Sequence, residues 1–114
     1  MKMFTNSDQT AKLIELGFEK PKGWNAEGIN SWFVMYKHKD NDEDFNYSIG
    51  ELIEMLPIEL EDVGINTTLT IHFDNNLAKV EYIGVLGIEY SIVKEELIDA
   101  LYDMIVKLKE EGVI

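Results

Sequence analysis

The sequence contains no cysteine and no arginine, and each absence excludes a class of function. Without cysteine there can be no disulfide, no thiolate nucleophile and no cysteine-bound metal. Without arginine the chain lacks the bidentate fork that reads phosphate groups and guanine. No stretch approaches the ~20 apolar residues of a membrane-spanning helix, and the first ten residues hold no apolar run of signal-peptide length. We therefore expect a cytoplasmic protein.

Positive charge is also scarce. The chain has 22 acidic residues against 10 basic ones, for a net charge of −12. Such a chain is repelled by nucleic acids and by anionic membranes, so we expect direct contact with neither. The excess of carboxylates either serves solubility or meets a basic protein partner.

The pattern of apolar residues predicts one α+β domain spanning residues 1–114. We expect a two-layer fold in which an antiparallel sheet of four to five strands packs on helices, in the order α-β-β-α-β-β(-β)-α. In the last helix, Leu97, Leu101, Met104 and Leu108 form an apolar stripe at helical spacing. The predicted helices cover 7–16, 49–56 and 94–110, and the predicted strands cover 31–39, 45–48, 67–74, 77–83 and 88–92.

A hairpin over residues 67–83 can be predicted with its register. A two-residue turn at Asn75 and Asn76 places Phe73 opposite Ala78 and Ile71 opposite Val80. The remaining apolar pair is Leu69 with Tyr82. All these residues then share one face, and Thr70 and Glu81 meet on the opposite face, which we expect to be solvated.

The segment "DNDEDFNYSIGE", residues 40–51, has the ligand spacing of a calcium loop. Asp40, Asp42 and Asp44 occupy its first, third and fifth positions, and Glu51 occupies the twelfth. The sixth position, where the motif needs glycine, is Phe45. A competing interpretation is a capping box, in which Ser48 and Glu51 hydrogen-bond each other's backbone amides at a helix start. The three aspartates would then form a solvated turn.

Further candidate sites lie elsewhere in the chain. Trp24 lies in an irregular connection and is a candidate contact for a partner, as are the carboxylates of Glu54, Glu59, Glu61 and Asp62. Asp99 and Asp103 share a helix face, as a glycosidase pair does, but acidic helix faces are usually just solvated. His38 and His72 are expected on strand surfaces. No nucleotide-binding or nucleophile motif occurs, so we expect neither an enzyme nor a cofactor.

The segment "YSIGELIEMLP" and the ending "ELIDALYDMIVKLKEEGVI" resemble a group of small, acidic, uncharacterised proteins of bacterial mobile elements and prophages. The resemblance covers about half of the chain. It implies a small α+β fold without a known activity, and it assigns no functional residue.

Two functional hypotheses remain. The first is a non-enzymatic interaction module whose acidic surface binds another protein, with a DNA mimic or mobile-element regulator as its narrower form. The second is a calcium or small-ligand binder that uses the acidic loop of residues 40–51. An exposed strand edge near Ile88 also leaves the choice between monomer and homodimer open.

The capping interpretation generates a prediction for calcium. If the Glu51 side chain caps the start of its own helix, it is not available to bind calcium. The amide chemical shifts of residues 40–51 should then be the same in millimolar calcium as in magnesium at the same ionic strength. A saturable shift confined to these residues would contradict this expectation and favour the metal site.

Overall fold

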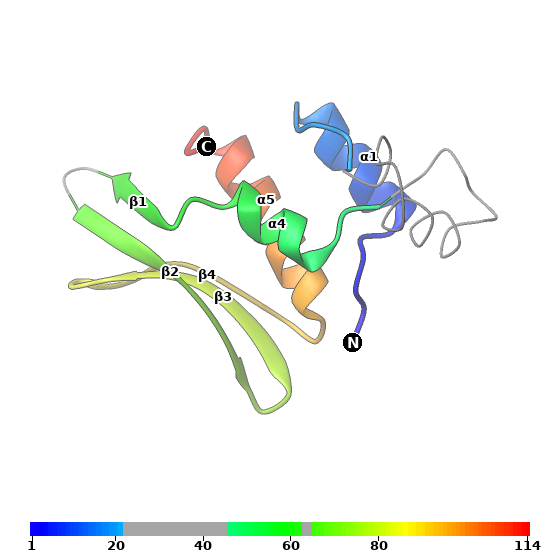
Figure 1. Ribbon diagram of the computed structural model, residues 1–114. Coiled ribbons are helices and arrows are strands. Elements are labelled where there is room, and N and C mark those ends of the chain that lie inside the picture. The colour runs from blue at the N-terminus through cyan, green and yellow to red at the C-terminus, as the bar shows by residue number, and fades with distance from the viewer. Residues whose placement is uncertain (22–45, 63–64) are drawn as a thin grey trace.

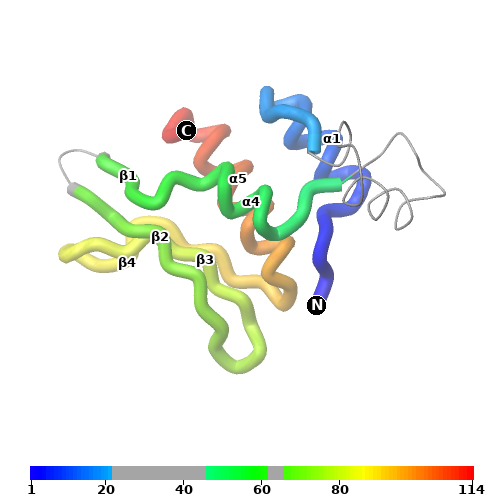
Figure 2. The backbone as a smooth tube through the Cα atoms, viewed as in Figure 1, coloured from blue at the N-terminus to red at the C-terminus, as the bar shows by residue number. Residues whose placement is uncertain are grey.

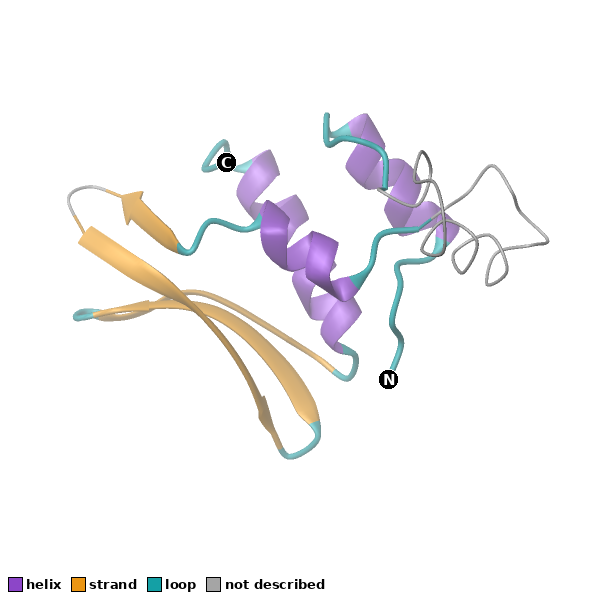
Figure 3. Ribbon diagram, viewed as in Figure 1, coloured by secondary structure: helices purple, strands orange, loops and turns teal. Residues whose placement is uncertain are grey.

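The sheet is an antiparallel meander with helices on one of its two faces (Figures 1 and 3). A computed structural model describes residues 1–21, 46–62 and 65–114. Its strands lie side by side in chain order, so each pairs with its sequence neighbours. The elements in order are α1 (Ser7–Glu15), α4 (Ile49–Met55), β1 (Glu59–Asp62), β2 (Ile65–Asp74), β3 (Leu77–Gly84), β4 (Gly87–Lys94) and α5 (Leu97–Glu110).

The predicted α+β class is confirmed, with four described strands and three described helices. The predicted strand over residues 31–39 lies outside the described residues. The short strand β1 was not predicted, because three of its four residues are acidic and give no alternation of apolar side chains. None of the described helices is both long enough and apolar enough to cross a membrane.

The predicted hairpin register is confirmed at each predicted pair. Phe73 lies opposite Ala78, Ile71 opposite Val80 and Leu69 opposite Tyr82. The turn residues Asn75 and Asn76 have φ of 52° and 65°, as a two-residue hairpin turn requires. The tube in Figure 2 shows this hairpin extending away from the helices, and Phe73, near its tip, is accordingly 54% exposed.

The start of α4 is fixed by the predicted capping box. The Glu51 amide donates to Ser48 Oγ at 3.2 Å, and the Ser48 amide donates to Glu51 Oε1 at 3.2 Å. Tyr47 and Leu52, the residues of the predicted hydrophobic staple, are both buried in the core. α1 is capped in the same way by Asn6 and Gln9.

The core lies between the sheet and α5. Half of this helix is buried, and it packs against β3 and β4 on one side and α4 on another. Tyr82, fully buried beneath it, donates its hydroxyl hydrogen to the Pro57 carbonyl at 2.7 Å. The buried residues of α5 are Leu97, Ile98, Ala100, Leu101, Met104, Ile105 and Leu108.

Three details of the prediction were wrong. Of the predicted strand over residues 45–48, residue 45 lies outside the described residues, and Ser48 forms only an isolated bridge with Phe4. α5 begins at Leu97, three residues after the predicted start, because Lys94 is the last residue of β4 and pairs with Ala78. The face of the hairpin that carries Glu81 is not simply solvated, because Glu81 is only 5% exposed.

A small buried polar network joins the N-terminal segment to the start of α4. The hydroxyls of Thr5 and Thr10 lie 2.7 Å apart, and Thr10 Oγ1 donates to Asn46 Oδ1 at 2.5 Å. The Tyr47 amide donates to Thr5 Oγ1 at 3.0 Å. All four residues are buried, so these bonds satisfy groups that would otherwise be costly to desolvate.

Two glycines with different surroundings give a test of this packing. A Cβ on Gly84 would lie 2.7 Å from the Asn66 carbonyl oxygen, whereas a Cβ on Gly50 in α4 would meet nothing closer than 3.9 Å. We expect Gly84→Ala to lower the free energy of unfolding by roughly 1–3 kcal/mol. Gly50→Ala should raise it by up to about 1 kcal/mol. Urea unfolding of both variants measures the difference, and midpoints that move in the same direction would contradict it.

Candidate functional site

The predicted calcium loop is only partly described. Asp40, Asp42 and Asp44 lie outside the described residues, as does Trp24. Glu51, the twelfth position, is described, and its Oε1 accepts hydrogen bonds from the Ser48 amide and the Ser48 hydroxyl, at 3.2 and 3.1 Å. Within residues 1–21, 46–62 and 65–114, no three histidines or carboxylates converge as metal ligands would. The reciprocal hydrogen bonds between Ser48 and Glu51 confirm the capping interpretation of these two residues.

The carboxylates predicted to contact a partner lie on two different elements. Glu54 is exposed on α4. Glu59 and Glu61 are exposed on the edge strand β1, opposite Thr68 and Asn66 of β2. Asp62 ends that strand. Glu54 is thus carried by the helical layer, and the others by the edge of the sheet.

A hollow of about 240 Å³ lies beside α4. Tyr47 donates its hydroxyl hydrogen to the Glu19 carbonyl at one side of it. Burial, and then the nearby Glu51 carboxylate, raises the pKa of Tyr47 to about 12, so this hydroxyl stays protonated at physiological pH. The lining residues are Phe18, Glu19, Lys20, Tyr47, Glu51, Glu54 and Met55.

A second group of carboxylates gathers along the exposed side of α5 and the start of α1. We call it the α1–α5 acidic surface and define it as Asp8, Glu96, Asp99, Asp103 and Glu110, together with Tyr102. Asp99, Asp103 and Glu110 recur at spacings of four and seven, which place them on one side of a helix. The surface therefore follows one ridge of α5 and continues onto α1.

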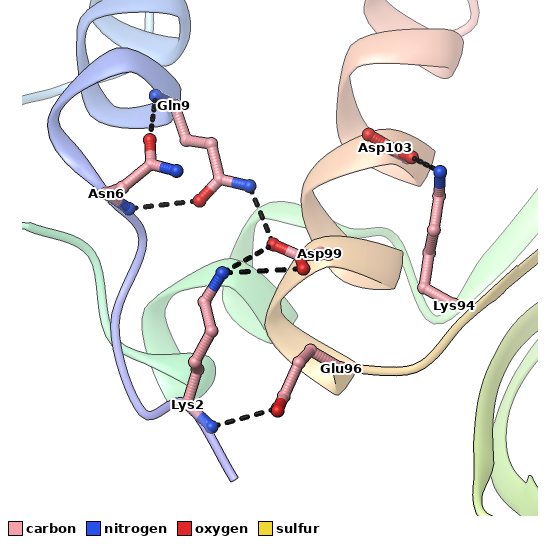
Figure 4. Close-up of polar contacts among 7 residues, drawn as sticks. All are labelled: Lys2, Asn6, Gln9, Lys94, Glu96, Asp99 and Asp103. Carbon is pink, nitrogen blue, oxygen red and sulfur yellow. Dashed lines mark hydrogen bonds and ion pairs between the residues drawn. The ribbon is translucent and has the colours of Figure 1, made fainter.

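Lys2 and Gln9 hold the two parts of this surface together (Figure 4). Lys2 Nζ lies 3.2 Å from Asp99 Oδ1, and the Lys2 amide donates to Glu96 Oε2 at 2.9 Å. Gln9, which also caps α1, donates from Nε2 to Asp99 Oδ1 at 2.8 Å. These bonds fix the N-terminal segment and α1 against the first turn of α5.

Tyr102 lies among the carboxylates of the α1–α5 acidic surface. Burial raises the pKa of Tyr102, and the carboxylates of Asp103, Glu110 and Asp8 raise it further. Its neighbour Val106 is half-buried in a shallow hollow whose rim includes Asp103 and Glu110. The surface thus places an aromatic and an aliphatic side chain beside charged groups, as protein interfaces place a polar rim around an apolar centre.

A third group, on the sheet face opposite the helices, surrounds the buried Glu81. Its Oε1 lies 2.7 Å from His72 Nε2, and its Oε2 accepts a hydrogen bond from Ser91 Oγ at 2.8 Å. The hydrogen bond with His72, and then that from Ser91, lowers the pKa of Glu81. The carboxylate lies between the hydroxyl and the imidazole here, whereas a nucleophilic triad places the imidazole in the middle. The arrangement stabilises a charged glutamate in the sheet.

Only some of the contacts in these carboxylate groups could be predicted from the sequence. Asp99 and Asp103 could be placed on one helix face, but Lys2, Gln9 and Asp8 join them only through tertiary contacts between residues some 90 positions apart. The Glu81 group required the pairing of β4 with β3, which brings Ser91 opposite Glu81. Neither the charge nor the spacing of single residues specifies such contacts.

No protein-family model, no curated protein and no solved structure matches this chain.

The Glu81 group generates a prediction about pH. Because its folded-state pKa is lowered, Glu81 contributes stability that is present above the ordinary glutamate pKa and is lost as the pH falls through the folded-state value. At about pH 5, Glu81→Gln should lower the free energy of unfolding by on the order of 1–2 kcal/mol. The difference from wild type should narrow as the pH is lowered to about 3.

Urea unfolding at several pH values below the ordinary range of histidine titration measures this effect. Glu61→Gln, which changes an exposed carboxylate on β1, is the matched control. Its free energy of unfolding should differ little from that of wild type at every pH. A Glu81→Gln difference that stays constant down to about pH 3 would show that the charge of Glu81 contributes nothing.

Proposed function

We propose that this protein is a small, non-enzymatic interaction module of the cytoplasm that binds a basic protein through the α1–α5 acidic surface. The observation that carries the proposal is the position of Tyr102 among Asp8, Asp103 and Glu110. Aromatic side chains that are partly desolvated and surrounded by polar groups are frequent energetic centres of protein interfaces. A lysine-rich or arginine-rich surface is the chemical complement of this arrangement.

The total charge of −12 alone does not select a binding surface. Carboxylates occur on every described helix and strand. This spread counts against the narrower hypothesis of a DNA mimic from a mobile element, which requires the charge to be concentrated on one face. The α1–α5 acidic surface is preferred because three of its carboxylates, those of Asp8, Asp103 and Glu110, lie near enough to Tyr102 to raise its pKa.

The surface is held in place before any partner arrives. The ion pair of Lys2 with Asp99, at 3.2 Å, and that of Lys94 with Asp103, at 3.1 Å, orient two of its carboxylates. A rigid surface loses little conformational entropy on binding. Both lysines are half-exposed, so an incoming basic group can share the same carboxylates, and salt should weaken the complex.

The alternative function, a small-ligand binder, is supported by the 240 Å³ hollow beside α4. Its lining combines two aromatic rings, those of Phe18 and Tyr47, with charged groups, as ligand sites often do. The calcium form of this alternative is less favoured, because Glu51 is held by the capping box.

A titration with a lysine-rich peptide distinguishes the surfaces. We expect amide resonances of α1 and α5 to shift, with an affinity that falls as salt is raised from about 50 to 500 mM. The double variant Asp103→Asn, Glu110→Gln should weaken binding by roughly tenfold. The control Glu59→Gln, Glu61→Gln removes the same charge from β1 and should bind as wild type does.

Equal weakening by both double variants would refute the proposed surface, because it would show that only total charge matters. Shifts centred on Phe18, Tyr47 and Glu54 would instead favour the hollow beside α4.

A further inference from the structure

The two edges of the sheet are built differently. β1 is four residues long, and three of them are acidic, so this edge is protected by shortness and charge. β4 is eight residues long and contains no proline, and its only charged residues are Glu89 and Lys94, which have opposite signs. No described strand pairs with its outer edge. Proteins rarely leave a long edge of low charge without a partner.

Exposed apolar side chains concentrate beside this same edge. Four of the nine large apolar side chains that are exposed in the described residues lie between residues 85 and 93. Val85 and Leu86, in the β3–β4 turn, are 97% and 79% exposed, and Ile88 and Val93, on β4, are 59% and 43% exposed. Such a patch is typical of an interaction surface.

We propose that β4 pairs antiparallel with β4 of a second copy of this chain, which joins the two four-stranded sheets into one. A basic partner is not favoured here, because Glu89 and Lys94 cancel and the segment carries no net charge. Two copies with a charge of −12 each repel one another over most of their surfaces. They can approach closely only where carboxylates are few, and the β4 edge is such a place.

The register of β4 on β3 shows which side chains share a face. The apolar side chains of β3 that are buried beneath the helices are Ala78, Val80 and Tyr82. The residues opposite them, Lys94, Ile92 and Tyr90, therefore lie on the helix-covered face. Ile88 and Val93 lie opposite residues of the other face. Directly opposed residues of an antiparallel pair point to the same side of the sheet. In a symmetric β4–β4 pair, residues of the helix-covered face must therefore lie opposite residues of that face in the second copy, and the same holds for the open face.

A two-fold axis at Ser91, the midpoint of residues 88–94, meets this condition. It places Tyr90 opposite Ile92 of the second copy on the helix-covered face. On the open face it brings Val93 beside the second copy's Ile88, because the bulge between Ile88 and Tyr90 shifts the register there. Both contacts occur twice in the dimer, so the partly exposed apolar residues of β4 are covered.

The first experiment measures mass against concentration by sedimentation, from about 1 µM to 1 mM, where typical dimer affinities fall. We expect a species of twice the 13.1 kDa chain mass. The double variant Ile88→Lys, Val93→Lys should raise the dimer Kd at least about tenfold by placing lysines on the edge. Phe73→Lys, at an equally exposed position of β2, is the control and should dimerise as wild type does.

The second experiment uses the absence of cysteine from the chain. Ser91→Cys places one thiol from each copy at the axis, where opposed Cα atoms are about 4.5–5.5 Å apart, within the range of a disulfide. Mild oxidation should give a covalent dimer in high yield. Glu61→Cys, on the β1 edge, should give little under the same conditions.

Each of the following results would overturn the proposal. A wild-type chain that stays monomeric at about 1 mM has no such interface. A dimer that survives the double lysine variant, or whose Ser91→Cys form fails to cross-link, pairs through another surface. A monomer whose β4 amides are nevertheless protected from exchange has this edge covered within its own chain, for which the predicted strand of residues 31–39 is the candidate.

Discussion

The apolar stripe of α5 is the constraint on which the architecture depends. Half of the fourteen residues of this helix are buried, and the sheet alone cannot cover them, because a helix surface is curved and the stripe spans more than one side. α4 packs against a further part of the stripe, and α1 is held beside its first turn by Gln9 and Lys2. All three described helices therefore lie on the same face of the sheet, and none of them covers the other face (Figure 3).

That one-sided arrangement explains the Glu81 group. On the open face of the sheet, side chains of neighbouring strands cover one another. A polar side chain on a central strand can therefore be buried there. Glu81 is covered by its neighbours and keeps its charge because His72 and Ser91 supply hydrogen bonds. Glu81, His72 and Ser91 therefore form a hydrogen-bonded polar cluster on the face that no described helix covers.

The features that were predictable from the sequence are those set by local rules. The register of the β2–β3 hairpin followed from Asn75, Asn76 and strict alternation, and the α4 cap followed from the spacing of Ser48 and Glu51. β1 could not be predicted, because its acidic residues are paired only through the backbone of β2. The α1–α5 acidic surface could be predicted only along α5, since Asp8 and Lys2 reach it from the other end of the chain.

The order of the elements along the chain has a consequence for how the molecule assembles. Residues 65–110 form three successive strands and α5, each joined to the next by a short turn, so this unit requires only small loops to close. α1 instead docks through contacts such as Gln9 with Asp99, which span 90 residues. Sub-global opening should therefore release α1 while the strands and α5 remain assembled. The part of the acidic surface that Asp8 supplies would then be present only while α1 is docked.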